Sequence, residues 1–295
     1  MKIGIGLPNP IPGVGGRTMI DWARRAEERG FSSLATIDRI AYPSYESLIA
    51  LAAAAAVTER IGLLTNIVLG PTRNPVLLAK EAASVDQISG GRFTLGVGVG
   101  GREDDFVAAG QEFHNRGRRW DEALELIQRA WRGEPVAGSP KPVTPSPVRP
   151  GGVPLLIGGS TDAAVARTVR WGIGWTAGGA PPEQVAPFVE RVRQAWKAAG
   201  RAGTPRIVAL SYYALGPNAE AGATAYIKDY YGFLGEWADR IAQGVPRTPE
   251  ALRELARRFE EIGVDELIFD PTIADLAQVD LLAEAVLSRG QYTRA

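Results

Sequence analysis

Short apolar runs alternate with longer amphipathic segments along the whole chain, about every 30 residues. The apolar runs lack a strict apolar–polar alternation, which is typical of parallel strands covered on both faces. They predict eight strands, at 2–7, 33–37, 62–69, 93–99, 154–158, 172–177, 206–215 and 266–270. Eight strands that alternate with helices, without a linker typical of a domain boundary, predict one α/β domain over residues 1–295. Its expected fold is a (β/α)8 (TIM) barrel.

Start and stop signals for helices lie between the predicted strands. Thr18, with Asp21 three residues later, resembles a capping box, and Gly30 is placed to end that helix. Asn74-Pro75 and Thr248-Pro249 each put a capping residue before a first-turn proline. These signals predict helices where a barrel of alternating strands and helices requires them.

Two segments exceed the basic repeat. Residues 133–152 contain six prolines and predict a loop before the fifth strand. Residues 217–246 predict a helical insertion after the seventh strand, rich in aromatic side chains: Tyr226, Tyr230, Tyr231, Phe233 and Trp237. Barrel enzymes build their sites from loops at the C-terminal rim, so this insertion is a candidate lid. A stripe that only packs on the barrel explains the aromatic residues equally well.

Composition excludes several kinds of chemistry. The chain has no Cys and one His, which excludes disulfides, thiol nucleophiles and a multi-histidine metal site. Its 33 basic and 33 acidic residues give no general attraction to nucleic acid or to an anionic membrane. No apolar run reaches the length of a membrane span, and the first residues lack the apolar region of a signal peptide. We therefore expect a cytoplasmic protein without a metal.

Residues 96–101, GVGVGG, match the dinucleotide-binding pattern G-x-G-x-x-G. That fingerprint belongs to the first βαβ unit of a doubly wound sheet, whereas here it follows the fourth of eight strands. Three acids at 103–105 come next; they would oppose a pyrophosphate and favour a solvated helix start. Alternate glycines in a barrel strand instead leave room for a flat ligand near the backbone.

A second glycine cluster suits an anion better. Residues 154–161, PLLIGGST, combine an apolar strand, two glycines and two hydroxyl residues before a predicted helix. Backbone amides, a hydroxyl group and a helix N-terminus together form a phosphate site. A simple turn in which Ser160 caps the helix fits the same residues.

Several stretches, in the same order along nearly the whole chain, resemble the bacterial luciferase-like flavin-dependent oxidoreductases. They are PVLLAK at 75–80, DQISGGR at 86–92, LGVGVG at 95–100, RGRRWDEAL at 116–124, PLLIGGS at 154–160 and RWGIGW at 170–175. The resemblance implies a barrel that binds FMN at its C-terminal rim, with the deazaflavin coenzyme F420 as the alternative. It is much less specific for the substrate.

The resemblance also implies individual cofactor contacts. Asn66, Gly98 and Gly100 would line the flavin ring, and Gly158, Gly159 and Ser160 would hold the phosphate. Trp175 would flank the cofactor tail or pack within the barrel. Many members of this family have a non-proline cis peptide bond at the end of the third strand, here near Asn66-Ile67.

One departure from the family concerns the candidate catalytic pair. The second strand of the family often ends in an aspartate-histidine pair, where this chain has Asp38-Arg39. Arginine is no general base at neutral pH, but Arg39 could orient an anionic substrate or stabilise developing negative charge. Asp38 would hold Arg39 or take a proton. His114 lies in a stretch that the family uses for structure, so it does not replace the missing histidine.

The resemblance implies a monooxygenase that uses reduced FMN and O2 on a small organic substrate. A homodimer and a separate flavin reductase are the expected partners. The first alternative is F420-dependent hydride transfer, for which Arg73 and Arg102 are the available cations for the anionic cofactor tail. The second is a non-catalytic flavin-binding or flavin-free barrel, suggested by the missing histidine.

Overall fold

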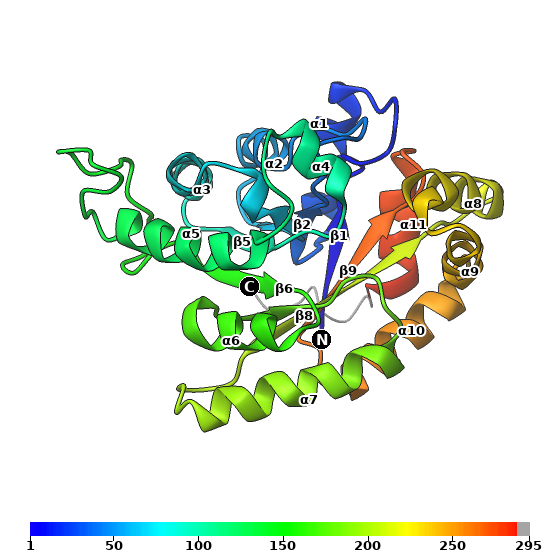
Figure 1. Cartoon of the computed structure of the whole chain (residues 1–295). Coiled ribbons are helices and arrows are strands. Elements are labelled where there is room, and N and C mark those ends of the chain that lie inside the picture. The colour runs from blue at the N-terminus through cyan, green and yellow to red at the C-terminus, as the bar shows by residue number, and fades with distance from the viewer. Residues whose placement is uncertain (288–295) are drawn as a thin grey trace.

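Parallel strands close into a barrel in the computed structural model, which describes residues 1–287 (Figure 1). The strands are β1 (Lys2–Gly6), β2 (Ser33–Thr36), β3 (Gly62–Thr65), β4 (Val68–Leu69), β5 (Phe93–Gly98), β6 (Leu155–Gly158), β7 (Gly174–Thr176), β8 (Arg206–Tyr213) and β9 (Glu266–Pro271). β3 and β4 share one position, because both pair with β5. The predicted eight-stranded TIM barrel is confirmed, with β3–β5 pairing closing the ring.

Helices cover the outside of the barrel (Figure 1). They are α1 (Gly16–Arg29), α2 (Ser47–Ala55), α3 (Pro75–Ile88), α4 (Glu103–Ala108), α5 (Arg116–Trp131), α6 (Asp162–Trp171), α7 (Pro182–Ala198), α8 (Ala219–Tyr230), α9 (Glu236–Gly244), α10 (Pro249–Glu261) and α11 (Ala277–Val286). Short 3-10 turns are η1 (Gly70–Thr72) and η2 (Gly232–Leu234). Within residues 1–287, no helix is both long and apolar enough to cross a membrane. Residues 288–295 of the predicted domain lie outside the described residues.

The capping predictions succeed at three helix ends and fail at one. Asn74 and Thr248 accept hydrogen bonds from the first backbone amides of α3 and α10. Gly30 ends α1 in the left-handed conformation, with φ 83°. Thr18 does not cap α1, which begins two residues earlier behind Gly15 and has no side-chain cap. The Thr18 prediction is therefore wrong.

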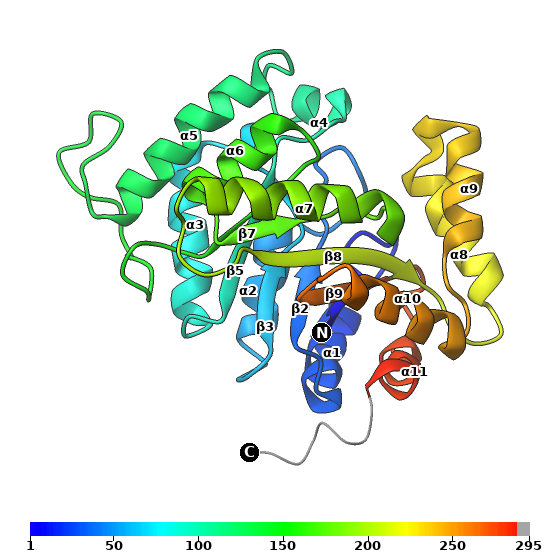
Figure 2. The ribbon, with the colours of Figure 1, turned by 90° about the horizontal axis from the view of Figure 1, so that it is seen from below.

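Both irregular segments are where the sequence predicts them. Residues 133–152 form a loop without helix or strand, and its Val148 amide donates to the buried Asp86 carboxylate at 2.7 Å. The insertion after β8 folds into α8, η2 and α9, and Figure 2 shows α8 and α9 side by side at one end of the barrel. The loop before the fifth strand position and the helical insertion are thus confirmed.

Side chains fill the barrel interior in layers, because alternate residues of each strand point inward. One buried layer consists of Ala35, Leu64, Leu156, Val208 and Ile268. Two residues further along each of these five strands, the next layer toward the C-terminal rim consists of Ile37, Asn66, Gly158, Leu210 and Asp270. This second layer contains an amide and a carboxyl group, so the barrel interior becomes polar toward the C-terminal rim.

A buried ion pair lies toward the opposite, N-terminal end of the barrel. Glu266 on β9 accepts hydrogen bonds from Ser32 and Ser33, at 2.5 and 2.7 Å, and from Arg206 at 2.5 Å. Burial opposes ionisation of Glu266, but Arg206 and the two hydroxyl groups outweigh it and lower the pKa of this carboxyl. The ionised form therefore contributes stability above the ordinary pKa of Glu, which is lost as the pH falls through the folded-state pKa.

Glu266→Gln should lower the free energy of unfolding at pH 7 by about 1–3 kcal/mol, since it leaves polar partners without their acceptor. The difference from wild type should shrink below about pH 4.5, because wild type then loses the same contribution. Urea unfolding of both proteins at pH 7 and pH 3 measures this. An equal difference at both pH values would contradict the assigned role of Glu266.

Candidate functional site

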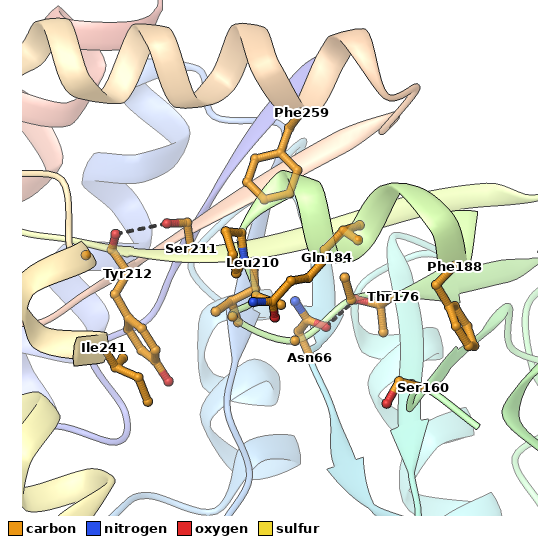
Figure 3. A pocket seen from close by; sticks show the side chains of 18 of the residues that line it. Asn66, Ser160, Thr176, Gln184, Phe188, Leu210, Ser211, Tyr212, Ile241 and Phe259 are labelled. Carbon is orange, nitrogen blue, oxygen red and sulfur yellow. Dashed lines mark hydrogen bonds between the residues drawn. The ribbon is translucent and has the colours of Figure 1, made fainter. Parts of the chain in front are cut away.

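A cavity of about 790 Å³ opens at the C-terminal ends of β3, β6, β7 and β8, beneath α7, α9 and α10 (Figure 3). This volume is typical of small-molecule and cofactor sites. Five of the nine predicted site residues line it: Asn66, Gly158, Gly159, Ser160 and Trp175. The other four, Asp38, Arg39, Gly98 and Gly100, are not among the lining residues.

Asn66 offers a hydrogen-bond donor to this cavity. Its Oδ1 accepts from Thr176 Oγ1 at 2.7 Å, and its Nδ2 is buried without a partner (Figure 3). The peptide bond between Asn66 and Ile67 is cis, which confirms the expectation from the family. An unpaired buried amide is costly, so a ligand acceptor at this position would satisfy it.

The turn from Gly158 to Ser160 also lines the cavity, next to Thr176 and Ile67. Thr161 caps α6, so the alternative in which Ser160 is the N-cap is wrong, and the Ser160 hydroxyl is exposed beside the turn. Gly159 has φ 112°, a conformation that favours glycine. Trp175 Nε1 donates to the Gly159 carbonyl at 2.7 Å and holds the turn in place. Backbone amides at a helix N-terminus suit a phosphate group.

Two glycines of β5 leave space that Thr65 and Ile67 fill, so a ligand does not occupy it. A Cβ on Gly98 would lie 2.7 Å from the Ile67 side chain, and one on Gly96 would lie 2.0 Å from the Thr65 carbonyl oxygen. Ile67, which lines the cavity, therefore stands between Gly98 and a ligand. The contact of Gly98 and Gly100 with a flavin ring stays a prediction, which this geometry does not favour.

Arg39 is buried at the rim and held by acids from α4. Its Nε donates to Asp105 at 2.7 Å and its Nη2 to Asp104 at 2.9 Å, while Nη1 is buried without a partner. Asp105 also accepts from the backbone amides of Ile40 and Ala41, at 2.7 and 2.8 Å. The expected solvated helix start is thus wrong for Asp105, whose side chain is 1% exposed.

Asp38 does not hold Arg39, so the first of its two predicted roles is wrong. Its carboxylate binds Arg73 Nη2 at 2.8 and 3.0 Å and accepts from the Leu69 amide at 2.9 Å. Neighbouring residues in an extended segment point in opposite directions, so Asp38 and Arg39 find different partners. Arg73 is also paired with Glu46, at 2.8 Å. Asp38 and Arg73 together fix the short strand β4 to the end of β2.

The aromatic insertion is fastened to the rim. The Arg102 guanidinium lies 4.5 Å from the Tyr230 ring centroid and 4.1 Å from that of Phe233, and it donates to the Tyr230 carbonyl at 2.8 Å. Tyr42, in the loop after β2, donates to Asp229 on α8. The insertion therefore covers the rim beside Arg39, as a lid would.

Several residues that line the cavity were not predicted from the sequence. Gly178 and Gly179 line the cavity after β7, and the glycine pair directly after a predicted strand was an available signal. Arg240 on α9 lines it too, but nothing in a helical pattern marks which face meets a cavity. His114 is exposed and bonds to Glu112. Among the described residues, no three His, Asp or Glu side chains gather as metal ligands.

Residues 1–259 match the family model described as luciferase-like monooxygenase. One relative, an uncharacterised protein of Mycobacterium tuberculosis, is 33% identical over 211 residues, which cover 68% of this chain and 73% of the relative. The crystal structure of the monooxygenase RslO1 from Streptomyces bottropensis is similar at 25% identity, with a TM-score of 0.77 and coverage of 97% of this chain and 99% of that one.

A second solved structure has the same fold. It is an F420-dependent secondary alcohol dehydrogenase in complex with an F420-acetone adduct, 18% identical, with a TM-score of 0.82 and coverage of 97% and 98%. The family match extends over most of the chain and agrees with the closed parallel barrel and the cis peptide bond. The chain therefore belongs to the luciferase-like monooxygenase family of oxidoreductases.

Proposed function

We propose that this protein is a monooxygenase that uses reduced FMN and O2 to oxidise a small organic substrate. The observation that carries the proposal is the cavity, which is lined by both a phosphate-suited turn and an unpaired amide donor. The likeness to the monooxygenase RslO1 over nearly the full length of both chains supports the same reaction class.

The residues present fit FMN. Gly158, Gly159 and Ser160 would hold the phosphate at the start of α6, and Asn66 Nδ2 would donate to an acceptor on the ring. Bound reduced flavin would supply the electrons and activate oxygen, which no side chain of this protein can do. Apolar side chains such as Leu210 and Phe188 line the same cavity and would exclude water from the ring.

Arg39 is the proposed contact for negative charge on the substrate. Asp105 and Asp104 fix its guanidinium, and the unpaired Nη1 keeps one donor available. Arginine stays protonated at neutral pH, so it orients or stabilises an anion and removes no proton. The contacts of Asp38 favour a positioning role, since Arg73 and the Leu69 amide occupy its carboxylate.

F420-dependent hydride transfer is the second candidate function. Arg240 on α9 lines the cavity, 4.7 Å from the Trp237 ring centroid, and could meet the anionic tail of F420. Arg73 and Arg102, the cations expected for that tail, are engaged by carboxylates and by aromatic rings respectively. The similar fold of an F420-dependent alcohol dehydrogenase is compatible with this second function.

Titration of the protein with FMN, riboflavin and F420, followed by absorbance and fluorescence, tests these functions. FMN should bind, and Ser160→Asp should weaken its binding about tenfold or more, because a carboxylate would oppose the phosphate. Riboflavin has no phosphate, so its affinity should be the same for both proteins. Ser139→Asp, in the exposed loop at 133–152, is the matched control and should change neither affinity.

Each outcome selects one function. Binding of F420 without FMN would favour hydride transfer, and binding of neither would leave the non-catalytic, flavin-free barrel. Unchanged FMN affinity in Ser160→Asp would show that the phosphate is held elsewhere.

A further inference from the structure

Several buried polar atoms at the barrel mouth and under the insertion have no hydrogen-bond partner within residues 1–287. Four of them are Arg39 Nη1, Asn66 Nδ2, Tyr226 Oη and Asp270 Oδ2. Each such atom costs about 1–3 kcal/mol. Unpaired groups gathered in one region indicate that a ligand completes them. The proposed flavin accounts for Asn66, and the proposed substrate for Arg39, which leaves Asp270 and Tyr226 to be explained.

Asp270 lies near the end of β9 and points into the barrel. It follows Ile268 of the interior layer by two residues, so the two side chains share the inward face. A Cβ on Gly6, in the adjacent strand, would lie 1.7 Å from Asp270 Oδ1. The carboxyl group therefore occupies the space that this glycine leaves on the inner wall, in the same layer as Asn66.

The surroundings of Asp270 favour its neutral form. Its side chain is buried, and burial raises the pKa of its carboxyl well above the ordinary value. No hydrogen bond or ion pair to the Asp270 side chain occurs within residues 1–287. The tyrosines 212, 213, 226 and 231 lie close enough for a charge on Asp270 to raise their pKa. A protonated carboxyl group donates a hydrogen bond, which an ionised one cannot do.

All four unpaired groups can then act as donors: a guanidinium, an amide, a phenol and a carboxylic acid. Their best complement is a molecule rich in acceptor oxygens. Tyrosine rings line the same region, with Tyr226 stacked on Tyr230 at a centroid distance of 5.7 Å and Tyr212 edge-on to Tyr226 at 5.9 Å. Flat aromatic molecules pack well against such rings.

We propose that Asp270 is a substrate-binding residue that donates a hydrogen bond to a carbonyl or phenolic oxygen of a planar, hydroxyquinone-like substrate. The inference rests on the proposed function for the identity of this ligand as the substrate. Asp270 is buried and is not among the residues that line the cavity, so the ligand reaches it only when the residues above it move.

Calorimetric titration with 2-hydroxy-1,4-naphthoquinone tests the inference in the cofactor-free and the FMN-saturated protein. The absence of Cys removes thiol addition to this quinone as a complication. We expect Asp270→Ala to weaken binding at least about tenfold, and Asp270→Asn, whose amide still donates, to stay within about threefold of wild type. Naphthalene, which has no oxygen, should bind at least about tenfold more weakly than the quinone.

Asp86→Ala is the matched control. Asp86 is a buried carboxyl with one unpaired oxygen, but it lies beneath the loop at 133–152, outside the barrel mouth. Its replacement should leave quinone affinity unchanged. FMN affinity should be the same in all variants, which separates loss of a substrate contact from general damage. Asp270→Leu repeats the comparison with a larger apolar side chain, should Asp270→Ala not fold.

Equal quinone affinity in wild type and Asp270→Ala, or in wild type and Asp270→Leu, would overturn the inference. So would a wild-type protein that binds naphthalene as tightly as the quinone. A wild-type protein that binds no flavin but shows the expected dependence on Asp270 would overturn the proposed function and support the binding role of Asp270.

Discussion

Gly96→Ala is expected to destabilise the barrel by more than about 3 kcal/mol. The new Cβ would lie 2.0 Å from the Thr65 carbonyl oxygen, which is main chain and cannot rotate away. β3 and β5 close the barrel at Leu63–Phe93 and Leu64–Thr94, so the clash would separate the two strands at the closing seam. Alanine gains about 0.5–1 kcal/mol over glycine in a strand, which is too small to offset this. Urea unfolding measures the change.

Gly101→Ala is the control from the same glycine run. Apart from Gly101 and its two chain neighbours, no described residue has an atom within 4 Å of a Cβ built on Gly101, and the residue is exposed. Its stability should stay within about 0.5 kcal/mol of wild type. Equal effects of the two substitutions would contradict the close approach of β3 and β5. The FMN affinity of folded Gly101→Ala should equal that of wild type.

The difference between Gly96 and Gly101 could not be predicted from the sequence. The apolar runs located all eight strand positions, because burial on both faces leaves a local signal. Neither the G-x-G-x-x-G pattern nor the strand signal states what fills the space beside a glycine. Here Thr65 and Ile67 fill it, about 30 residues earlier in the chain.

The candidate site was predictable only where its features are local in the sequence. The turn at 158–160 is a local feature, so its residues and the capped helix that follows could be identified. Partners of charged residues are not local. The adjacent pair Asp38 and Arg39 suggested a mutual contact, but Arg39 binds Asp105, 66 residues away, and Asp38 binds Arg73. Asp270 ends a predicted strand, yet only the packed barrel shows that it lacks a partner.

The largest effect of a single side chain in the rim is expected for Asp105→Ala. Asp105 accepts three hydrogen bonds, from Arg39 Nε and from the amides of Ile40 and Ala41. The Arg39 side chain is 5% exposed, so the substitution leaves a buried charge without its main partner. Removing one partner of a buried ion pair costs about 3–5 kcal/mol. Thermal and urea unfolding at pH 7 should show a loss in this range.

Asp104→Ala separates that loss from the loss of an acid at the start of α4. Asp104 bonds to the same guanidinium, but its side chain is 56% exposed, and such pairs contribute at most about 1 kcal/mol. Both acids lie in the first turn of α4, so any contribution from the helix dipole is similar and cancels in the comparison. Equal destabilisation by the two substitutions would contradict the burial of the Arg39–Asp105 pair.

A double variant measures how much of the contribution of Asp105 to the free energy of unfolding is electrostatic. The double variant Arg39→Met, Asp105→Ala has no unpaired buried charge. It still lacks the two hydrogen bonds from the backbone amides of Ile40 and Ala41. It should therefore be more stable than Asp105→Ala alone, because an uncompensated buried charge is more costly than an apolar side chain in the same place. If the double variant is no more stable, Asp105 acts mainly by capping the amides of Ile40 and Ala41. Arg39 would then be held in position by Asp104 and the aromatic rings of Tyr42 and Tyr230.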